Sequence, residues 1–159
     1  MKQKSIPVRT IVESGLIAAL YVLLVWVFEP ISFGMVQVRI AEALYVFIFF
    51  TQSGVWGVSI GCLLANILFP HYGLLDIILG TLATFLGAVI VYLFREHRYL
   101  ALLGPVFTNG FIVAAVLYWA AGFPYWINVL YIAAGEALAL YCIGYFLTKA
   151  LDHIYPRLS

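Results

Sequence analysis

Six apolar segments follow one another along this chain, and only short polar turns separate them. They cover residues 10–28, 40–50, 53–69, 74–94, 99–121 and 126–150. A bilayer with a hydrocarbon core about 30 Å thick needs about 20 apolar residues per helical crossing, a length that most of these segments approach. The chain of 159 residues is 65% hydrophobic and 9% charged, which is typical of a membrane protein. We predict one all-α integral membrane domain, residues 1–159, with six transmembrane helices, of which the short second one could be tilted or partly re-entrant.

The basic residues predict how this domain is oriented. Cytoplasmic loops of membrane proteins carry an excess of Lys and Arg. With the N-terminus inside, only Arg39 of the eight basic residues falls outside. The other seven are Lys2, Lys4, Arg9, Arg95, Arg98, Lys149 and Arg157. We therefore expect both termini in the cytoplasm, which agrees with an even number of crossings.

The sequence carries no pattern typical of catalysis or of a bound cofactor. The basic N-terminal residues precede an apolar run of full span length, so we expect no cleaved signal peptide. Cys62 and Cys142 lie in separate apolar segments, which indicates neither a disulfide nor a metal site. There is no nucleotide-binding loop and no recognisable nucleophile. We expect no enzyme activity, no cofactor, no metal and no nucleic-acid partner.

The acidic and amide residues are distributed unevenly across the predicted membrane. Glu13, Glu96 and Asp152 lie at the inner ends of the segments. Most other polar side chains fall at or below the outer surface: Glu29, Gln37, Arg39, Glu42, Asn66, His71, Asp76, Asn128 and Glu136. Charge inside a membrane is costly and usually occurs in a cavity or a site. The asymmetry predicts a polar pocket that opens to the outside.

Glu136 is the strongest candidate for a site residue. It follows Trp126 by ten residues, which places it about 15 Å along its helix. A carboxylate at that depth needs a cationic, hydrogen-bonded or liganded partner, although a structural bond to another helix would also satisfy it. Asp76 could serve in the same pocket or only cap a helix. Asn66 and Asn109 could contact a ligand or only join two helices.

The stretch VQVRIAEAL, residues 36–44, lies between the first two apolar segments. If it is helical, Arg39 and Glu42 are neighbours at i and i+3 and can form an ion pair that fixes the start of the second helix. If it is extended, Gln37 and Arg39 point to the same side. The alternative to a structural role is that Arg39 and Glu42 border the outer pocket and exchange partners with a ligand.

Small residues recur at four-residue spacing on several segments. Gly57, Gly61 and Ala65 would lie on one face of the third helix. The first helix carries two such strips: Ser14 with Ala18, and Gly15 with Ala19. Such strips let helices approach closely. The spacing does not decide whether the partner is internal or another protein.

Several motifs together resemble the QueT family. They are SFGMVQVRIAEAL, GCLLANIL, GLLDIILGTLATFLGA, LLGPVFTNGFIV and AAGEALALYCIGY, in this order, over roughly residues 15–145. Members of this family are substrate-binding S components of energy-coupling factor (ECF) transporters and are associated with uptake of queuosine precursors. The resemblance implies a multi-pass protein of the bacterial cell membrane whose binding site is near the extracellular face.

The resemblance also implies partners that supply the energy. An S component docks to a shared transmembrane coupling protein with two ATPase subunits, and it topples in the bilayer to deliver its ligand. This agrees with a chain that has no nucleotide site of its own. S components often meet the coupling protein through an alanine-x-x-x-alanine pattern. Here the matching positions read Ser14/Ala18 or Gly15/Ala19, so the likeness assigns that contact to these four residues only weakly.

The ligand that the resemblance implies is preQ1, 7-aminomethyl-7-deazaguanine, or a related deazapurine. A carboxylate can accept two adjacent N–H groups of its ring edge, and a second carboxylate can bind its ammonium. We expect Glu136 to read the ring edge and Asp76 or Glu42 to bind the ammonium. The expected binding residues are Gln37, Arg39, Glu42, Asn66, Asp76, Asn109 and Glu136.

Two other functions compete with this interpretation. A small exporter or channel that assembles with itself and uses an ion gradient would explain Glu136 as a proton-coupled group. An intramembrane enzyme is the third possibility, and the missing nucleophile and metal pattern argue against it. Copurification with ATPase subunits would distinguish the S component from the exporter.

Overall fold

The computed structural model describes residues 7–32 and 37–154, and all regular structure in these ranges is helical. The longer helices are α1 (Val8–Val27), α3 (Ser53–Leu68), α5 (Thr81–Leu93), α7 (Leu103–Ala121), α8 (Tyr125–Leu138) and α9 (Gly144–Asp152). The shorter ones are α2 (Glu29–Ser32), α4 (Gly73–Leu75) and α6 (Arg98–Ala101). A 3-10 helix, η1 (Ile40–Phe49), and two π-helical turns, η2 (Asp76–Gly80) and η3 (Ala139–Ile143), complete the set.

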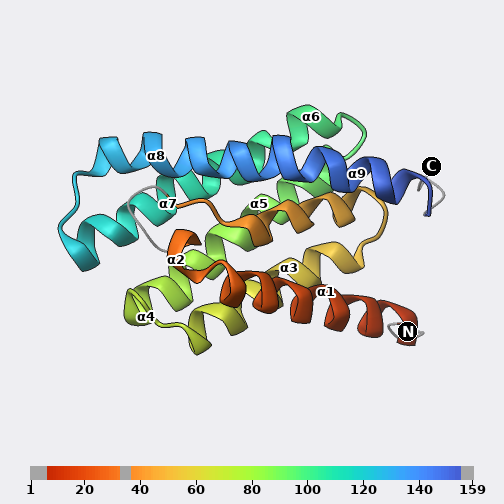
Figure 1. Cartoon of the computed structure of the whole chain (residues 1–159), viewed down its shortest axis with the longest axis horizontal. Coiled ribbons are helices and arrows are strands. Elements are labelled where there is room, and N and C mark those ends of the chain that lie inside the picture. Colours follow the sequence, from red (N-terminus) through yellow and green to blue (C-terminus); the bar gives the residue numbers. More distant parts are fainter. Residues whose placement is uncertain (1–6, 33–36, 155–159) are drawn as a thin grey trace, which may run out of the picture.

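The long helices run side by side along the length of the molecule, and the two ends of the chain lie at the same end of the bundle (Figure 1). Four continuous helical stretches are long and apolar enough to cross a membrane: Val8–Val27, Gly73–Leu93, Arg98–Ala121 and Tyr125–Asp152. Ile40–Phe49 and Ser53–Leu68 are apolar but shorter. The all-α prediction is confirmed for the described residues, and all six predicted segments contain a helix. Lys2, Lys4 and Arg157, used above to predict the orientation, lie outside the described ranges.

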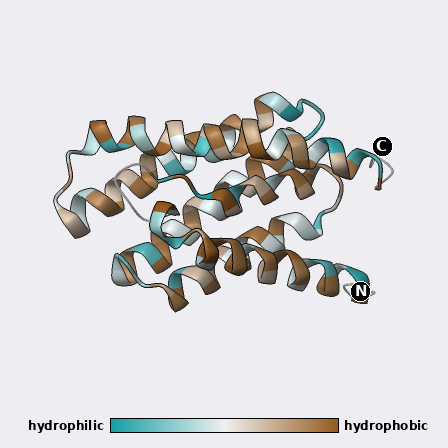
Figure 2. Cartoon of the chain, in the orientation of Figure 1, coloured by the Kyte–Doolittle hydropathy of each residue, from teal (hydrophilic) through white to brown (hydrophobic). Residues whose placement is uncertain are grey.

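The surface of the bundle is apolar, as a lipid environment requires. Figure 2 shows hydrophobic residues along most of each long helix, with hydrophilic residues concentrated at turns and ends. Leu16, Phe107 and Leu130 are 67%, 56% and 70% exposed, whereas Glu42 and Asn66 are completely buried. This inverts the pattern of a soluble protein, since the polar side chains are the ones withdrawn from the surface.

Close packing of α1 on α3 explains the small residues of α3. A Cβ atom on Gly57 or Gly61 would lie 2.6 Å from Ile17 or Tyr21 of α1, so only glycine permits this approach. The hydroxyl of Ser14 donates to the carbonyl of Ser53 at 3.1 Å. The partner of the glycine strip is therefore internal, which answers the question that the spacing left open.

Residues 37–39, which precede η1, pack tightly on α8. Residues 37–39 have no regular secondary structure, and η1 begins directly after them. A Cβ atom on Gly135 of α8 would collide with the carbonyl oxygen of Gln37. The missing side chain at Gly135 thus lets residues 37–39 lie on α8 one residue away from Glu136. This contact brings residues 37–44, the described part of the VQVRIAEAL stretch, into the interior of the bundle.

Candidate substrate-binding site

All seven residues predicted to bind the ligand are buried. Their exposed fractions lie between 0% and 4% for Gln37, Arg39, Glu42, Asn66, Asp76, Asn109 and Glu136. They come from residues 37–39, η1, α3, η2, α7 and α8. Hydrogen bonds, the Gln37–Gly135 contact and the charges that act on Glu136 connect them. We call this group the polar cluster; it lies nearer to the end of the bundle away from the termini.

Arg39 connects residues 37–39 to α3 through a hydrogen bond. Its Nη2 donates to Oδ1 of Asn66 at 2.9 Å, and its Nη1 lies 4.0 Å from the sulfur of Cys62. Asn66 in turn donates through Nδ2 to the backbone carbonyl of Asp76 at 3.0 Å. Asp76 is the first residue of η2, and π-helical turns of this kind frequently mark functional sites in helices.

Glu42 faces α1, and it is held by a residue that the sequence did not reveal. The hydroxyl of Tyr21 donates to Oε1 of Glu42. Arg39 and Glu42 therefore both bond to other helices and do not serve only to start η1. Nothing in the sequence distinguished Tyr21 from the ten other tyrosines.

A second set of missed contacts surrounds Cys62. Thr84 donates through Oγ1 to the sulfur of Cys62 at 3.2 Å, and the hydroxyl of Tyr45 donates to the carbonyl of Thr84 at 2.8 Å. The apolar surroundings of Cys62 in the sequence indicated packing, but its thiol also contacts Asn66 and Arg39 of the polar cluster. A buried thiol next to Asn66 and Thr84 is a weak acceptor, and it completes their hydrogen bonding.

Asn109 of α7 and Glu136 of α8 form the part of the polar cluster that lies between these two helices. Asn109 donates through Nδ2 to Oε1 of Glu136 at 2.7 Å. The charges of Glu42 and Arg39 act on Glu136, so the three groups share one electrostatic environment. Glu136 is 2% exposed, so its carboxyl group lies inside the bundle.

The polar cluster contains buried acceptor atoms that have no donor among the described residues. Within the described ranges, Glu42 Oε2, Asp76 Oδ2 and Asn109 Oδ1 are buried and accept no hydrogen bond. Each buried polar atom without a partner costs about 1–3 kcal/mol. One guanidinium, that of Arg39, is buried in the same cluster as three carboxyl groups. Such a site suits a ligand that brings positive charge and several N–H donors.

Other polar residues predicted on the outer side do not join this site. His71 Nε2 and Glu29 Oε1 lie 3.0 Å apart in an exposed pair. Asn128 of α8 is buried, with neither amide atom hydrogen-bonded inside residues 7–32 and 37–154. Across those same ranges, no three His, Cys, Asp or Glu side chains are placed to hold a metal ion.

The two small-residue strips of α1 differ in their surroundings. Ser14 and Ala18 are buried in the contact with α3. Gly15 and Ala19 are exposed, and no atom lies within 4 Å of a Cβ built on Gly15. Of the four residues assigned to a partner contact, only Gly15 and Ala19 are open to another protein.

Comparison with known proteins agrees with the motifs. The curated "Queuosine precursor transporter QueT" of Lactococcus lactis subsp. cremoris (strain MG1363) is 34% identical over 95 residues. That match covers 56% of this chain, and the chain spans only about half of the relative (55%). No solved structure matches the chain significantly. The family model described as "QueT transporter" matches residues 11–153, and the chain therefore belongs to the QueT transporter family.

Proposed function

We propose that this protein is the membrane-embedded substrate-binding subunit of an ECF-type ABC importer, and that it binds preQ1 or a related deazapurine from outside the cell. The observation that carries the proposal is the surplus of buried carboxyl acceptors around Arg39. Membership of a transporter family and the name of the Lactococcus relative, a queuosine precursor transporter, support it.

The chemistry of preQ1 matches the unfilled part of the polar cluster. Glu136 accepts the adjacent N–H groups of the guanine-like edge, as carboxylates do with base edges. Glu42 or Asp76 accepts the ammonium of the aminomethyl arm in a charge-assisted bond, using an oxygen that has no donor in the structure. Arg39 donates to the exocyclic carbonyl oxygen O6 of the base. A cationic ligand also offsets the excess of carboxyl groups.

Entry of the ligand requires residues 37–39 to move. In the structure they lie on Gly135 and carry Gln37 and Arg39 into the cluster. The two cavities described in the bundle, of about 220 and 160 Å³, are lined by other residues. In this proposal the ligand takes the place of contacts that now involve Arg39.

Six crossings with both termini in the cytoplasm accommodate this site. The segment from Gln37 to Phe49 is the shortest, yet ten residues of 3-10 helix rise about 20 Å, more than the α-helical 15 Å or so. The three residues before it, of which Arg39 is extended, add at most about 10 Å. The sum, about 30 Å, is enough to cross the hydrocarbon core. The two termini at one end of the bundle support an even number of crossings.

Energy for uptake comes from partners. The chain has no nucleotide-binding loop, so a coupling protein with two ATPases drives the cycle. The exposed strip of Gly15 and Ala19 on α1 is the part of the predicted contact that is available to the coupling protein.

Affinity purification from the native membrane tests this function. We expect a tagged chain to retain the coupling protein and both ATPases, and vesicles with the full complex to take up preQ1 only with ATP inside. The opposite result, uptake or export by the purified chain alone under an ion gradient, would establish the homo-oligomeric exporter instead.

A further inference from the structure

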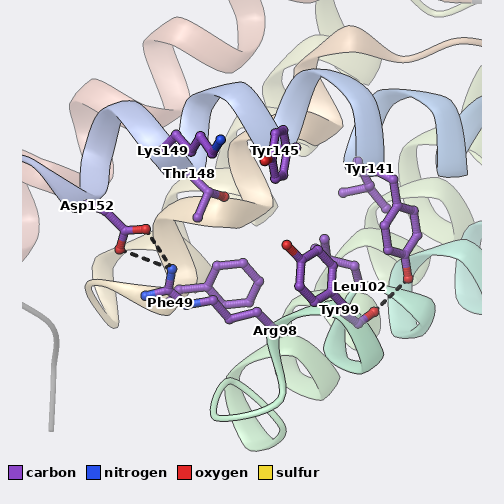
Figure 3. A pocket seen from close by; sticks show the side chains of 10 residues that line it. Phe49, Arg98, Tyr99, Leu102, Tyr141, Tyr145, Thr148, Lys149 and Asp152 are labelled. Carbon is purple, nitrogen blue, oxygen red and sulfur yellow. Dashed lines mark hydrogen bonds and ion pairs between the residues drawn. The ribbon is translucent and has the colours of Figure 1, made fainter.

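A cavity of about 220 Å³ lies far from the polar cluster, toward the end of the bundle that carries the termini. It is enclosed by the end of η1, by α6 and by the last helix (Figure 3). Lys149 follows Glu136 by thirteen residues on the continuous helical stretch Tyr125–Asp152, which corresponds to about 20 Å. The proposed function uses none of the residues that line this cavity.

Two cations and one carboxylate line the cavity. Arg98 donates through Nη1 to both oxygens of Asp152, at 3.1 and 3.2 Å. Its guanidinium also lies 5.5 Å and 5.0 Å from the ring centres of Phe49 and Phe50. Among the described residues, Nη2 and Nε of Arg98 donate no hydrogen bond, so this side of the guanidinium remains available.

Lys149 is the second cation of the cavity. Its Nζ lies 4.7 Å from the centre of the Tyr145 ring. Within residues 7–32 and 37–154 it forms no ion pair. With Arg98 held by Asp152 and Lys149 without an acid, the cavity carries a net positive charge. It is complementary to one monoanionic group.

The surroundings of the cavity are those of a membrane surface. Tyr99 and Tyr145 line it and are 65% and 38% exposed, while Phe146 and Leu103 beside them expose apolar surface. The polar turn around Arg95 is adjacent in sequence to α6. Tyrosines and snorkelling cations of this kind gather at the level of lipid headgroups. An aromatic belt alone does not need a cavity that holds an ammonium without an ion pair to any described residue.

We propose that this cavity binds the headgroup of an anionic glycerophospholipid, with its phosphate between Lys149 and the open side of Arg98. Basic pockets between transmembrane helices bind lipid headgroups in this manner. Asp152 accepts hydrogen bonds from hydroxyl groups of a glycerol headgroup, which favours phosphatidylglycerol over phosphatidylcholine. The acyl chains lie over the apolar surface of Leu103 and Phe146. The lipid would fasten the last helix to α6 at the end opposite the ligand site.

Native mass spectrometry of the purified protein, titrated with phosphatidylglycerol or phosphatidylcholine, tests the site. We expect tighter retention of phosphatidylglycerol, and a loss of about fivefold in its affinity for Lys149→Gln, since one surface cation contributes about 1 kcal/mol. Arg98→Gln should weaken retention as well. Arg95→Gln is the matched control, because Arg95 contacts Tyr92 and does not line the cavity.

Three results would overturn the proposal. One is equal retention of both lipids by the unmodified protein. Another is an equal loss for Lys149→Gln and Arg95→Gln, which would mean attraction by surface charge alone. The third is displacement of phosphatidylglycerol by millimolar glycerol 3-phosphate, which would identify a site for soluble phosphate esters. Lys149 is exposed, so its variant should keep the melting temperature of the original protein and the comparison stays valid.

Discussion

At the scale of single residues, the polar cluster is characterised by its ratio of buried carboxyl groups to cations, and we expect this ratio to govern which ligand binds. Arg39 stands against Glu42, Asp76 and Glu136, and all four are at most 4% exposed. A buried carboxylate keeps its charge only with compensation from a cation or from N–H donors. An anionic or purely apolar ligand would leave this imbalance in place, whereas a cationic base with several N–H groups removes it.

Glu136→Gln tests the role of that carboxylate. The amide keeps the shape and can still accept the bond from Asn109, but it replaces one acceptor by a donor. We expect the dissociation constant for preQ1 to rise at least tenfold, about 1.4 kcal/mol, as measured by calorimetry on the purified variant. Glu29→Gln, which changes an exposed acid outside the cluster, should bind as the original protein does. If a folded Glu136→Gln variant binds equally well, Glu136 is not in the site.

At the scale of helices, two glycines decide whether the cluster forms, because each permits one close approach. Gly61 lets α3 contact Tyr21 of α1, and Tyr21 holds Glu42. Gly135 lets residues 37–39 lie on α8. The helix contacts and the site are thus coupled, and changes outside the cluster should alter binding.

Gly61→Ala should disturb stability and binding together. The new methyl group would lie 2.6 Å from Cβ of Tyr21, and overpacking of this kind costs about 1–3 kcal/mol. We expect a lower melting temperature and weaker preQ1 binding. Gly15→Ala on the open face of α1, with no atom within 4 Å, is the control for stability and should not lower the melting temperature, because alanine suits a helix interior better than glycine. Equal melting temperatures for both variants would contradict the packing of α1 on α3.

Gly135→Ala should act mainly on the site. Its methyl group would collide with the carbonyl oxygen of Gln37, so residues 37–39 and with them Arg39 must move. We expect preQ1 affinity to fall at least tenfold, about 1.4 kcal/mol. Gly110→Ala changes the facing helix, where the nearest atom would be 3.4 Å away in an ordinary contact, and it should bind normally. Normal binding by Gly135→Ala would show that residues 37–39 do not border the ligand.

At the scale of the whole molecule, the sequence predicted most of the architecture because a bilayer allows few alternatives. Apolar length predicted the helices, and the depth expected for Glu136 and the side on which Asp76 and Asn66 fall predicted that these residues share a cluster. The 3-10 form of η1 was not predictable, because apolar periodicity does not resolve the pitch of so short a helix. The contacts of Tyr21 and Thr84 with the cluster were not predicted, because they depend on which helix faces each side chain.

The predicted orientation can be tested by labelling single cysteines from either side of the membrane. In a chain with the exposed Cys142 replaced by serine, Glu96→Cys should react only from the cytoplasmic side and His71→Cys only from outside. Both positions are exposed in turns between the long helices. Labelling of both from the same side would contradict six crossings with the termini inside.

The measurement that tests the central claim most directly is calorimetric binding of preQ1 to the purified protein, with guanine as the comparison. Guanine has the same hydrogen-bonding edge but lacks the ammonium that Glu42 or Asp76 is expected to hold. We predict tight binding of preQ1 and roughly 10- to 150-fold weaker binding of guanine, since a hydrogen bond to a charged group contributes about 1.5–3 kcal/mol. Equal affinities would remove the ammonium from the site, and absence of binding by both compounds would contradict the proposed function.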